Sequence, residues 1–373
     1  MKHPPPPLIE TPAQLETLCR RLRQSPWLAL DTEFHRERTY RPTLCLLQVA
    51  VPGLCACIDT LRLGDLTPLL EILHDPARTK VFHSAVQDLE VLYGLDETPL
   101  RPLFDTQVAA PLLGYRDQLG YGDLVAALLG IRLTKSQTRT DWRRRPLSPE
   151  QLAYAADDVV YLARLYPLMR DALRERGRLD WLDEDFERLS DPARYRPDPE
   201  AAWLRFKNGR FLPPAQQAAL RLLAAWRERR AEAENRPRGW ILRDDLLLAI
   251  AREQPASRER LARLCADQNL GDAALNELLA LLAPLSRDDH AGFVAGFVQA
   301  PAPRRPSAQE LAQVRRLQAH LRHRCREAGI EPRTVTGRRE LERLVRGEQG
   351  LRVCQGWRRH FIGEELLAMA GQA

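Results

Sequence analysis

The stretch that decides the fold is Leu28-Ala-Leu-Asp31-Thr-Glu33-Phe34, an apolar segment that carries two acids two residues apart. Its composition over 26–34 predicts a buried β-strand. Alternate side chains of a strand share a face, so Asp31 and Glu33 point the same way. Two carboxylates on a central strand repel each other and lose hydration unless cations compensate them. Divalent cations such as Mg²⁺ or Mn²⁺ prefer oxygen ligands, so the pattern indicates a metal site.

A further acid follows in Phe82-His-Ser-Ala-Val-Gln-Asp88, where a strand pattern over 80–83 leads into a helical one. Asp88 is expected near the start of that helix. It is either a further metal ligand or a carboxylate that only interacts favourably with the positive end of the helix dipole. His83, at the end of the strand, is either a ligand of the site or a histidine whose hydrogen bonds are made within the fold.

A third acidic segment is SPEQLAYAADDVVYL over 148–162. Ser148 is a good helix N-cap and Gln151 completes a capping box with it. Tyr154 and Asp158 are four residues apart and therefore share one helix face. Asp157 is rotated by about 100° from its neighbour and is expected to face elsewhere.

The remaining chain divides into three parts. Strands are expected at 26–34, 44–51, 54–59 and 80–83, and residues 1–8 are taken as a proline-rich leader. Helices are expected at 11–23, 66–73, 86–93, 106–113, 123–129 and 149–174, then at 214–234, 244–253, 257–264, 272–282, 307–328, 337–346 and 356–370. Linkers are expected at 190–201 and 299–306. This order predicts one α/β domain followed by two small all-helical domains.

Composition narrows the class of protein. The 373 residues are 44% apolar and 28% charged, which is typical of a globular chain. The apolar runs are too short for a membrane span, and the N-terminus has no secretory h-region. Seven cysteines without a CxxC pair favour reduced thiols, so we expect a cytoplasmic protein that makes no membrane contact.

Charge is concentrated at the C-terminal end. The chain carries a net charge of +6, whereas residues 301–373 alone, with 15 Arg and eight Glu, carry +7. A basic terminal domain beside a nearly neutral body suits a polyanionic ligand. A solvated arginine-rich surface would have the same composition, and charge alone does not choose between the two.

Taken together, the acids at 31, 33, 88 and 158 and the tyrosine of the YxxxD pattern resemble the DEDD exonuclease superfamily, tyrosine branch. The segments over 31–50, 82–92, 104–115, 120–125 and 135–162 resemble bacterial ribonuclease D in particular. Residues 220–283 resemble an HRDC helical domain.

The resemblance implies a ribonuclease H-like exonuclease domain at 1–195, an HRDC domain at 208–292 and a second HRDC-like domain at 300–373. It implies 3′-to-5′ hydrolysis of RNA with release of nucleoside 5′-monophosphates. The expected partner is RNA with a free 3′ end, such as a precursor tRNA, and the chain is expected to be a monomer; protein partners are left open.

The same resemblance assigns roles to the five residues. Two divalent metal ions, Mg²⁺ or Mn²⁺, would stabilise the attacking and leaving oxygens. Asp31 would bridge both ions, Glu33 and Asp158 would complete the site that activates water, and Asp88 would hold the second ion. Tyr154 would orient the attacking water by a hydrogen bond.

Other side chains near these motifs are candidate substrate contacts. Ribose contacts, base stacking and backbone contacts are the three kinds considered. The candidates are Thr32 and His83 for the ribose, Phe34 and Tyr40 for stacking, and Lys135, Arg139 and Trp142 for the backbone. Phe34 and Trp142 are equally compatible with plain core positions.

Two other functions stay open. A DNA 3′-5′ exonuclease of the same superfamily would use the same carboxylates. A non-catalytic RNA-binding scaffold would rely on the helical domains, although it would have no need of all four acids and the tyrosine. A helicase is disfavoured because the sequence has no GxxxxGK[ST] loop.

Overall fold

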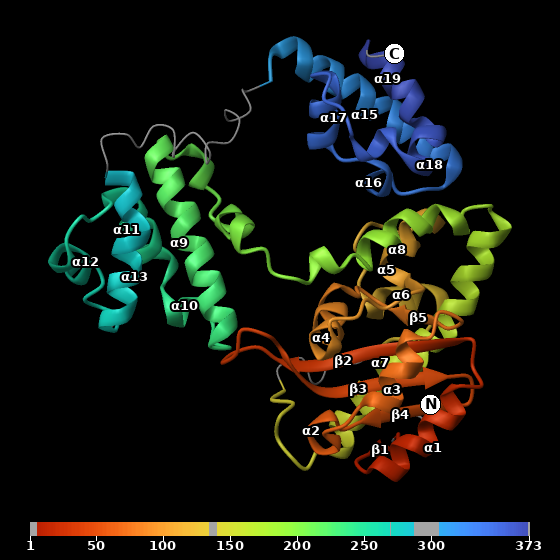
Figure 1. The fold of residues 1–373 in the computed structure, drawn as a ribbon. Helices are drawn as coiled ribbons and strands as arrows, with labels where there is room; N and C mark the ends of the chain where they lie inside the picture. Colours follow the sequence, from red (N-terminus) through yellow and green to blue (C-terminus); the bar gives the residue numbers. More distant parts are fainter. Residues whose placement is uncertain (1–5, 134–139, 269, 287–305, 372–373) are drawn as a thin grey trace. The chain divides into compact units, whose positions relative to one another are not determined.

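The chain forms two compact units in a computed structural model that describes residues 6–133, 140–268, 270–286 and 306–371 (Figure 1). The first unit contains 1–35, 44–195 and 305–373. The second contains 36–43 and 196–304. Within the described ranges, no helix is both long and apolar enough to cross a lipid bilayer.

A six-stranded sheet organises the first unit, with the strand order β1-β4-β3-β2-β5-β6. The strands are β1 (Leu8–Ile9), β2 (Trp27–His35), β3 (Thr43–Val51), β4 (Leu54–Ile58), β5 (Thr79–Phe82) and β6 (Leu103–Asp105). β3 and β4 are antiparallel, whereas β5 runs parallel to both β2 and β6. All four strands expected from the sequence are present, and β2 lies inside the sheet as its apolar first half requires.

Two short strands were not expected. Residues 1–8 were taken as a leader, yet Leu8 and Ile9 form β1 and pair with Cys57 and Ile58 of β4. β6 has three residues. Neither segment is long enough to show a period-two pattern, and each becomes a strand only because a neighbouring strand offers hydrogen-bonding groups.

Helices cover the sheet of the first unit. They are α1 (Pro12–Leu22), α2 (Thr60–Leu63), α3 (Thr67–His74), α4 (Val86–Asp96), α5 (Thr106–Ala109), α6 (Tyr121–Leu129), α7 (Pro149–Glu175) and α8 (Asp183–Leu189). The expected capping box of Ser148 and Gln151 starts α7. This long helix packs against β2, β4 and β5. Its small residues Ala155 and Ala156 are fully buried, which allows close approach to the sheet.

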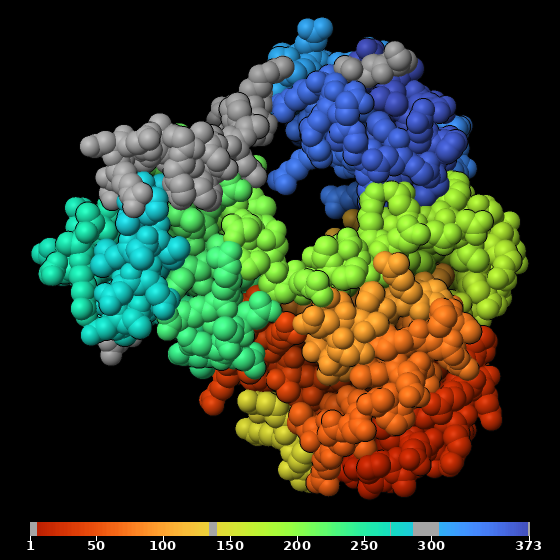
Figure 2. Space-filling model, viewed as in Figure 1, coloured from red at the N-terminus to blue at the C-terminus, as the bar shows by residue number. Residues whose placement is uncertain are grey.

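The C-terminal helices share the core of the first unit. They are α15 (Ala308–Ala328), α16 (Pro332–Val335), α17 (Arg338–Val345), α18 (Gly356–Arg358) and α19 (Glu364–Ala370), with the π-helix η8 (Arg359–Gly363) between the last two. The fully buried Arg358 pairs with Asp185 at 2.7 Å and Glu184 at 3.3 Å, both in α8. The rings of Trp181 and Trp357 stack with centroids 4.4 Å apart. Side chains of α8 and of the C-terminal helices meet in Figure 2. Part of the basic charge of this segment is therefore neutralised inside the fold.

The second unit is helical. Its helices are α9 (Pro214–Ala233), α10 (Arg238–Ile241), α11 (Asp244–Glu253), α12 (Arg258–Leu264) and α13 (Asp272–Leu282). Short 3₁₀ turns fall mainly between helices: η1 (Ala110–Leu113), η2 (Leu179–Leu182) and η3 (Pro192–Arg194) in the first unit, η4 (Pro199–Arg205), η5 (Gly209–Phe211) and η6 (Ala283–Ser286) in the second, and η7 (Arg352–Cys354) before α18. The segment 190–201, expected to be a linker, contains η3 and begins η4. The buried core of the second unit contains Leu220, Leu223, Leu247 and Leu278.

We expect Arg358→Ala to lower the free energy of unfolding by about 3 kcal/mol, because it removes a fully buried cation and leaves Asp185 with only the partly exposed Arg352 as a partner. Chemical denaturation measures the change. Arg359→Ala is the matched control, since this neighbour is largely exposed and pairs with Glu364 at the surface; its effect should stay below about 1 kcal/mol. Equal losses in both variants would contradict the expectation.

Candidate active site

A cavity of about 370 Å³ opens where β2 and β5 end and α4 and α7 begin. Four of the five predicted catalytic residues lie on two elements, β2 and α7, and the fifth lies on α4. The cavity is lined by Asp31, Thr32, Glu33, Phe34, His83, Ser84, Gln87, Asp88, Tyr121, Tyr154, Asp158 and Leu162. The fold thus brings together acids that are up to 127 positions apart in the sequence.

Three carboxylates form the centre of the site. Asp31 and Glu33 come from the same face of β2, as strand alternation predicts, and Asp158 comes from α7. One oxygen of each lies within 4.8 Å of the others. An all-oxygen donor set at this spacing, half-buried beside apolar core, fits a divalent cation of the Mg²⁺ or Mn²⁺ type.

Asp88 is fixed by the strand that carries the other acids. Its Oδ1 accepts hydrogen bonds from the Thr32 backbone N–H at 3.1 Å and from the Thr32 hydroxyl at 2.6 Å. The turn before α4 is fixed in the same way, because the carboxylate of Asp105 accepts from the backbone N–H groups of Ser84 and Ala85. Ser84 has a left-handed φ of 65°. These contacts hold Asp88 beside Asp31 and Glu33 rather than in solvent.

Burial raises the pKa of all four carboxyl groups. The charges of nearby acids raise it further, although the hydrogen bonds from Thr32 offset part of the rise at Asp88. The pKa of Glu33 rises to about 8, and those of Asp88 and Asp158 rise to about 7. The pKa of Asp31 lies well above its usual range. At neutral pH the four groups therefore cannot all be ionised at low cost without a cation.

Tyr154 lies beside the acids on α7, half-buried in the wall of the cavity. Burial, and then the charges of Asp158, Glu33 and Asp31, raise the pKa of its hydroxyl to about 12. The hydroxyl therefore keeps its proton near neutral pH and acts as a hydrogen-bonding group, not as a base.

His83 and Tyr121 form another wall of the cavity. His83 Nδ1 lies 2.9 Å from Thr106 Oγ1, and the Thr106 hydroxyl donates to the Phe82 carbonyl. Burial lowers the pKa of His83. The Tyr121 ring meets the His83 ring edge-on at 5.4 Å, and its hydroxyl donates to the Asp157 carbonyl. Asp157 itself is not among the lining residues, as the helix rotation predicts.

The candidate substrate contacts have different outcomes. Thr32, Phe34 and His83 line the cavity, so their contacts with a substrate stay predictions. Lys135 and Arg139 lie outside the described residues.

The prediction that Tyr40 offers a stacking surface is wrong. Tyr40 belongs to the second unit, where only 7% of it is exposed. Its hydroxyl donates to Glu228 at 2.5 Å, and the Arg238 guanidinium covers its ring at 4.5 Å. The Arg238 guanidinium covers the ring, and the ring packs in the hydrophobic core of the second unit, so no face is open for a base to stack on.

Trp142 is a core residue rather than a surface contact. It is 6% exposed and packs in a small cluster with Cys45, Leu147 and Ala155. Its ring stacks on Tyr154 with centroids 6.4 Å apart and planes 29° apart. The expected backbone contact is therefore replaced by a contact with a cavity-lining side chain.

Ser84, Gln87, Tyr121 and Leu162 line the cavity but had no predicted role. Gln87 could have been found, because it directly precedes Asp88 in the second motif. Leu162 lies one turn beyond Asp158 on the same helix face. For Tyr121 the only signal was the resemblance of the segment 120–125.

Comparison with known proteins agrees with this geometry. A family described as 3′-5′ exonuclease matches residues 6–174, and the HRDC domain family matches residues 216–280. Ribonuclease D of Gluconacetobacter diazotrophicus is 42% identical over 98% of this chain and 93% of its own length. Ribonuclease D of Sphingobium indicum is 39% identical over 96% of this chain and 93% of its own.

A solved structure agrees as well. The crystal structure of Escherichia coli RNase D, described as an exoribonuclease involved in structured RNA processing, superposes with a TM-score of 0.82 at 29% identity. The match covers 98% of this chain and 99% of that one.

Fold and site together define a 3′-5′ exonuclease with a ribonuclease H-like catalytic domain, an HRDC domain and a dependence on divalent metal ions. The chain belongs to the ribonuclease D family, and it is a 3′-5′ exoribonuclease. The expected second HRDC-like domain at 300–373 and the expected domain boundaries stay predictions.

The raised carboxyl pKa values predict how stability depends on pH. In the unfolded chain these groups titrate near about 4. The folded chain then binds more protons than the unfolded chain up to about pH 8, the pKa of Glu33, so metal-free stability falls as pH rises through this window. We expect the Tm in chelator to drop by roughly 5 °C or more between pH 5 and pH 8.

Added Mg²⁺ should raise the Tm more at pH 8 than at pH 6, because more carboxylates are then ionised to receive it. Thermal unfolding followed by circular dichroism measures both effects. Asp158→Asn should weaken both the pH slope and the response to Mg²⁺, whereas Asp123→Asn, at an exposed acid outside the cavity, should weaken neither. An equal response to Mg²⁺ at both pH values would contradict the expectation.

Proposed function

We propose that this enzyme trims the 3′ ends of precursor tRNAs and other small structured RNAs, releasing nucleoside 5′-monophosphates. The observation that carries the proposal is the group of Asp31, Glu33 and Asp158 within 4.8 Å, in a cavity open to a strand end. Its working form would be a cytoplasmic monomer; the seven cysteines, all in the described part, are free thiols, which supports the compartment.

Asp31, Glu33 and Asp158 would hold one divalent ion, and Asp88 together with Asp31 would hold a second. When bound, Mg²⁺ or Mn²⁺ ions acidify the attacking water and stabilise charge on the phosphate. The protein residues set the geometry. β2 provides two ligands from one face, and the two Thr32 hydrogen bonds keep Asp88 from turning away.

The Tyr154 hydroxyl would hold and orient the attacking water. Its raised pKa supports this role, because a protonated phenol donates a hydrogen bond and leaves proton removal to other groups. Its position one turn before Asp158 aims it at the same space as the carboxylates.

The other lining residues would hold the terminal nucleotide. Phe34 offers a ring against which any base can stack. Thr32 and His83, which line the same cavity, would contact the terminal ribose, and contact with a 2′-hydroxyl distinguishes RNA from DNA.

The second unit supplies a basic cavity that suits an RNA backbone. It measures about 380 Å³ and is lined by Arg205, Phe206, Arg227, Arg238, Gly239, Arg243 and Asp244. Arg227 and Arg238 are held by Asp244 and Glu228. Arg205 pairs with Glu228 and Arg243 with Asp245, but both arginine side chains are about half exposed, so phosphates can reach them.

The proposed activity is tested with a 3′-extended tRNA and a DNA strand of matched sequence, with Mg²⁺, with Mn²⁺ and with chelator. We expect metal-dependent release of nucleoside 5′-monophosphates from the RNA and none in chelator. Asp31→Ala should lower the rate by at least about 10³-fold, since it removes several kcal/mol of stabilisation. Asp157→Asn is the matched control and should retain activity.

Equal or faster digestion of the DNA would replace this proposal by a DNA exonuclease. RNA binding without cleavage under either metal would replace it by an RNA-binding scaffold.

The basic cavity is tested by the double variant Arg205→Gln with Arg243→Gln. Removal of two phosphate contacts should weaken binding of the 3′-extended tRNA by about tenfold at moderate salt and make the salt dependence shallower by roughly two ion equivalents. Filter binding over a salt series measures both. Arg260→Gln, an exposed arginine of the same unit outside the cavity, is the control. An unchanged salt slope in the double variant would exclude the cavity as an RNA contact.

A further inference from the structure

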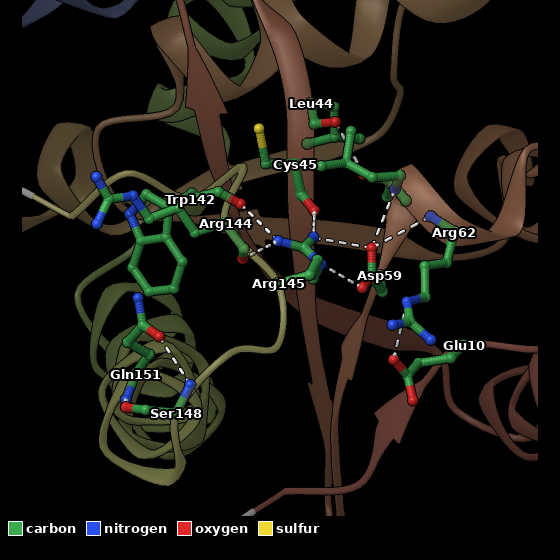
Figure 3. A network of polar contacts seen from close by, with 12 residues as sticks. Glu10, Leu44, Cys45, Asp59, Arg62, Trp142, Arg144, Arg145, Ser148 and Gln151 are labelled. Atoms are coloured by element: carbon green, nitrogen blue, oxygen red, sulfur yellow. Dashed lines mark hydrogen bonds and ion pairs between the residues drawn. The ribbon is translucent and has the colours of Figure 1, made fainter.

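Arg145 is held by an unusually complete set of acceptors just before α7 (Figure 3). Its Nε donates to Asp59 Oδ2 at 2.5 Å, and one terminal nitrogen donates to Asp59 Oδ1 at 2.8 Å and to the Cys45 carbonyl at 2.9 Å. The other terminal nitrogen donates to the Trp142 carbonyl at 2.7 Å. Asp59 is fully buried and the Arg145 side chain is only 15% exposed, so this forked pair is shielded from water.

The ion pair joins three parts of the first unit. Asp59 follows β4 and caps α2, where its Oδ1 accepts from the backbone N–H groups of Leu61 and Arg62. Cys45 lies on β3, next to the strand that carries the catalytic acids. Trp142 lies in the segment that leads into α7. Arg145 therefore ties that segment to the sheet.

This tie reaches the cavity through Trp142. The indole ring stacks on the Tyr154 ring, and the two residues belong to one small cluster with Cys45, Leu147 and Ala155. The Trp142 carbonyl is the atom that Arg145 holds. A shift of the Arg145 guanidinium therefore moves the surface against which the Tyr154 ring rests.

We propose that the Asp59–Arg145 ion pair positions Tyr154 for catalysis, acting through Trp142. The pair touches neither substrate nor metal ligands, so both members are positioning residues. The inference rests on the water-orienting role proposed for Tyr154. A misplacement of about 1 Å costs on the order of 10²-fold in rate, so a small displacement of this ring is sufficient.

The test uses the full chain with saturating Mg²⁺ and the 3′-extended tRNA. Arg145→Lys keeps the positive charge and loses the fork; Asp59→Asn keeps an oxygen to cap α2 and loses the ionic partner. We expect each to lower kcat by roughly 10- to 100-fold and to change KM by less than about threefold. Arg144→Gln is the matched control, because this neighbour is 85% exposed and should leave kcat unchanged.

A merely structural role is separated by combining each variant with Tyr154→Phe. If the ion pair acts by placing the Tyr154 hydroxyl, its loss should have little further effect once that hydroxyl is gone. Additive losses in kcat would overturn the proposal, and so would a rise in KM at unchanged kcat. Thermal unfolding of each variant shows that the assays are made on folded protein, and Asp59→Asn is the milder change should Arg145→Lys fold poorly.

A failure of the water-orienting role proposed for Tyr154 can be told apart from a failure of the positioning proposal. If Tyr154→Phe alone leaves kcat unchanged, the water-orienting role falls and the positioning proposal falls with it. Activity that is lost in Asp31→Ala but insensitive to Tyr154→Phe would still support the exoribonuclease itself.

Discussion

The crowding of four carboxylates into one largely dehydrated cavity is the constraint on which the rest of this structure depends. Burial raises the pKa of Asp31, Glu33, Asp88 and Asp158, and the charges of other site acids raise the pKa of Asp31, Glu33 and Asp158 further. A chain without further support would relieve this strain by turning one acid toward water. The fold prevents such relief, and it thereby keeps a site that takes up divalent cations, or protons when no cation is bound.

Each acid is held by an element that is itself tied down by well-satisfied groups. β2 lies between two neighbouring strands, so its side-chain directions are set by the sheet. α4 starts on a turn fixed by Asp105, and the acid on it is held by Thr32. α7 starts on a capping box, and the segment before it is bound by Arg145. The rigidity of the site is therefore supplied by residues outside it.

The sequence was sufficient wherever a local rule decides the outcome. Strand alternation placed Asp31 and Glu33 on one face, and helix spacing placed Tyr154 with Asp158. Prediction from the sequence failed where contacts between distant residues determine whether a side chain is buried. Tyr40 is buried because it meets Glu228, 188 positions away, and Trp142 is buried because it packs in a cluster with Cys45 of β3. The three residues of β6 likewise become a strand only beside β5.

Buried acids outside the site show what the catalytic acids lack. Asp59 pairs with Arg145, Asp185 with Arg358 and Glu228 with Arg238. In these pairs the cation is a side chain of the same chain, the pairing is permanent, and the consequence is structural. At the cavity, the charges that act on Asp31 and Glu33 are those of the other site acids, and no side-chain cation is among the causes that shift their pKa values. The negative charge of the cavity must therefore be compensated by ions that bind and leave. Pairing of opposite charges stabilises the fold elsewhere, and at the end of β2 the lack of such a pair creates a reactive centre.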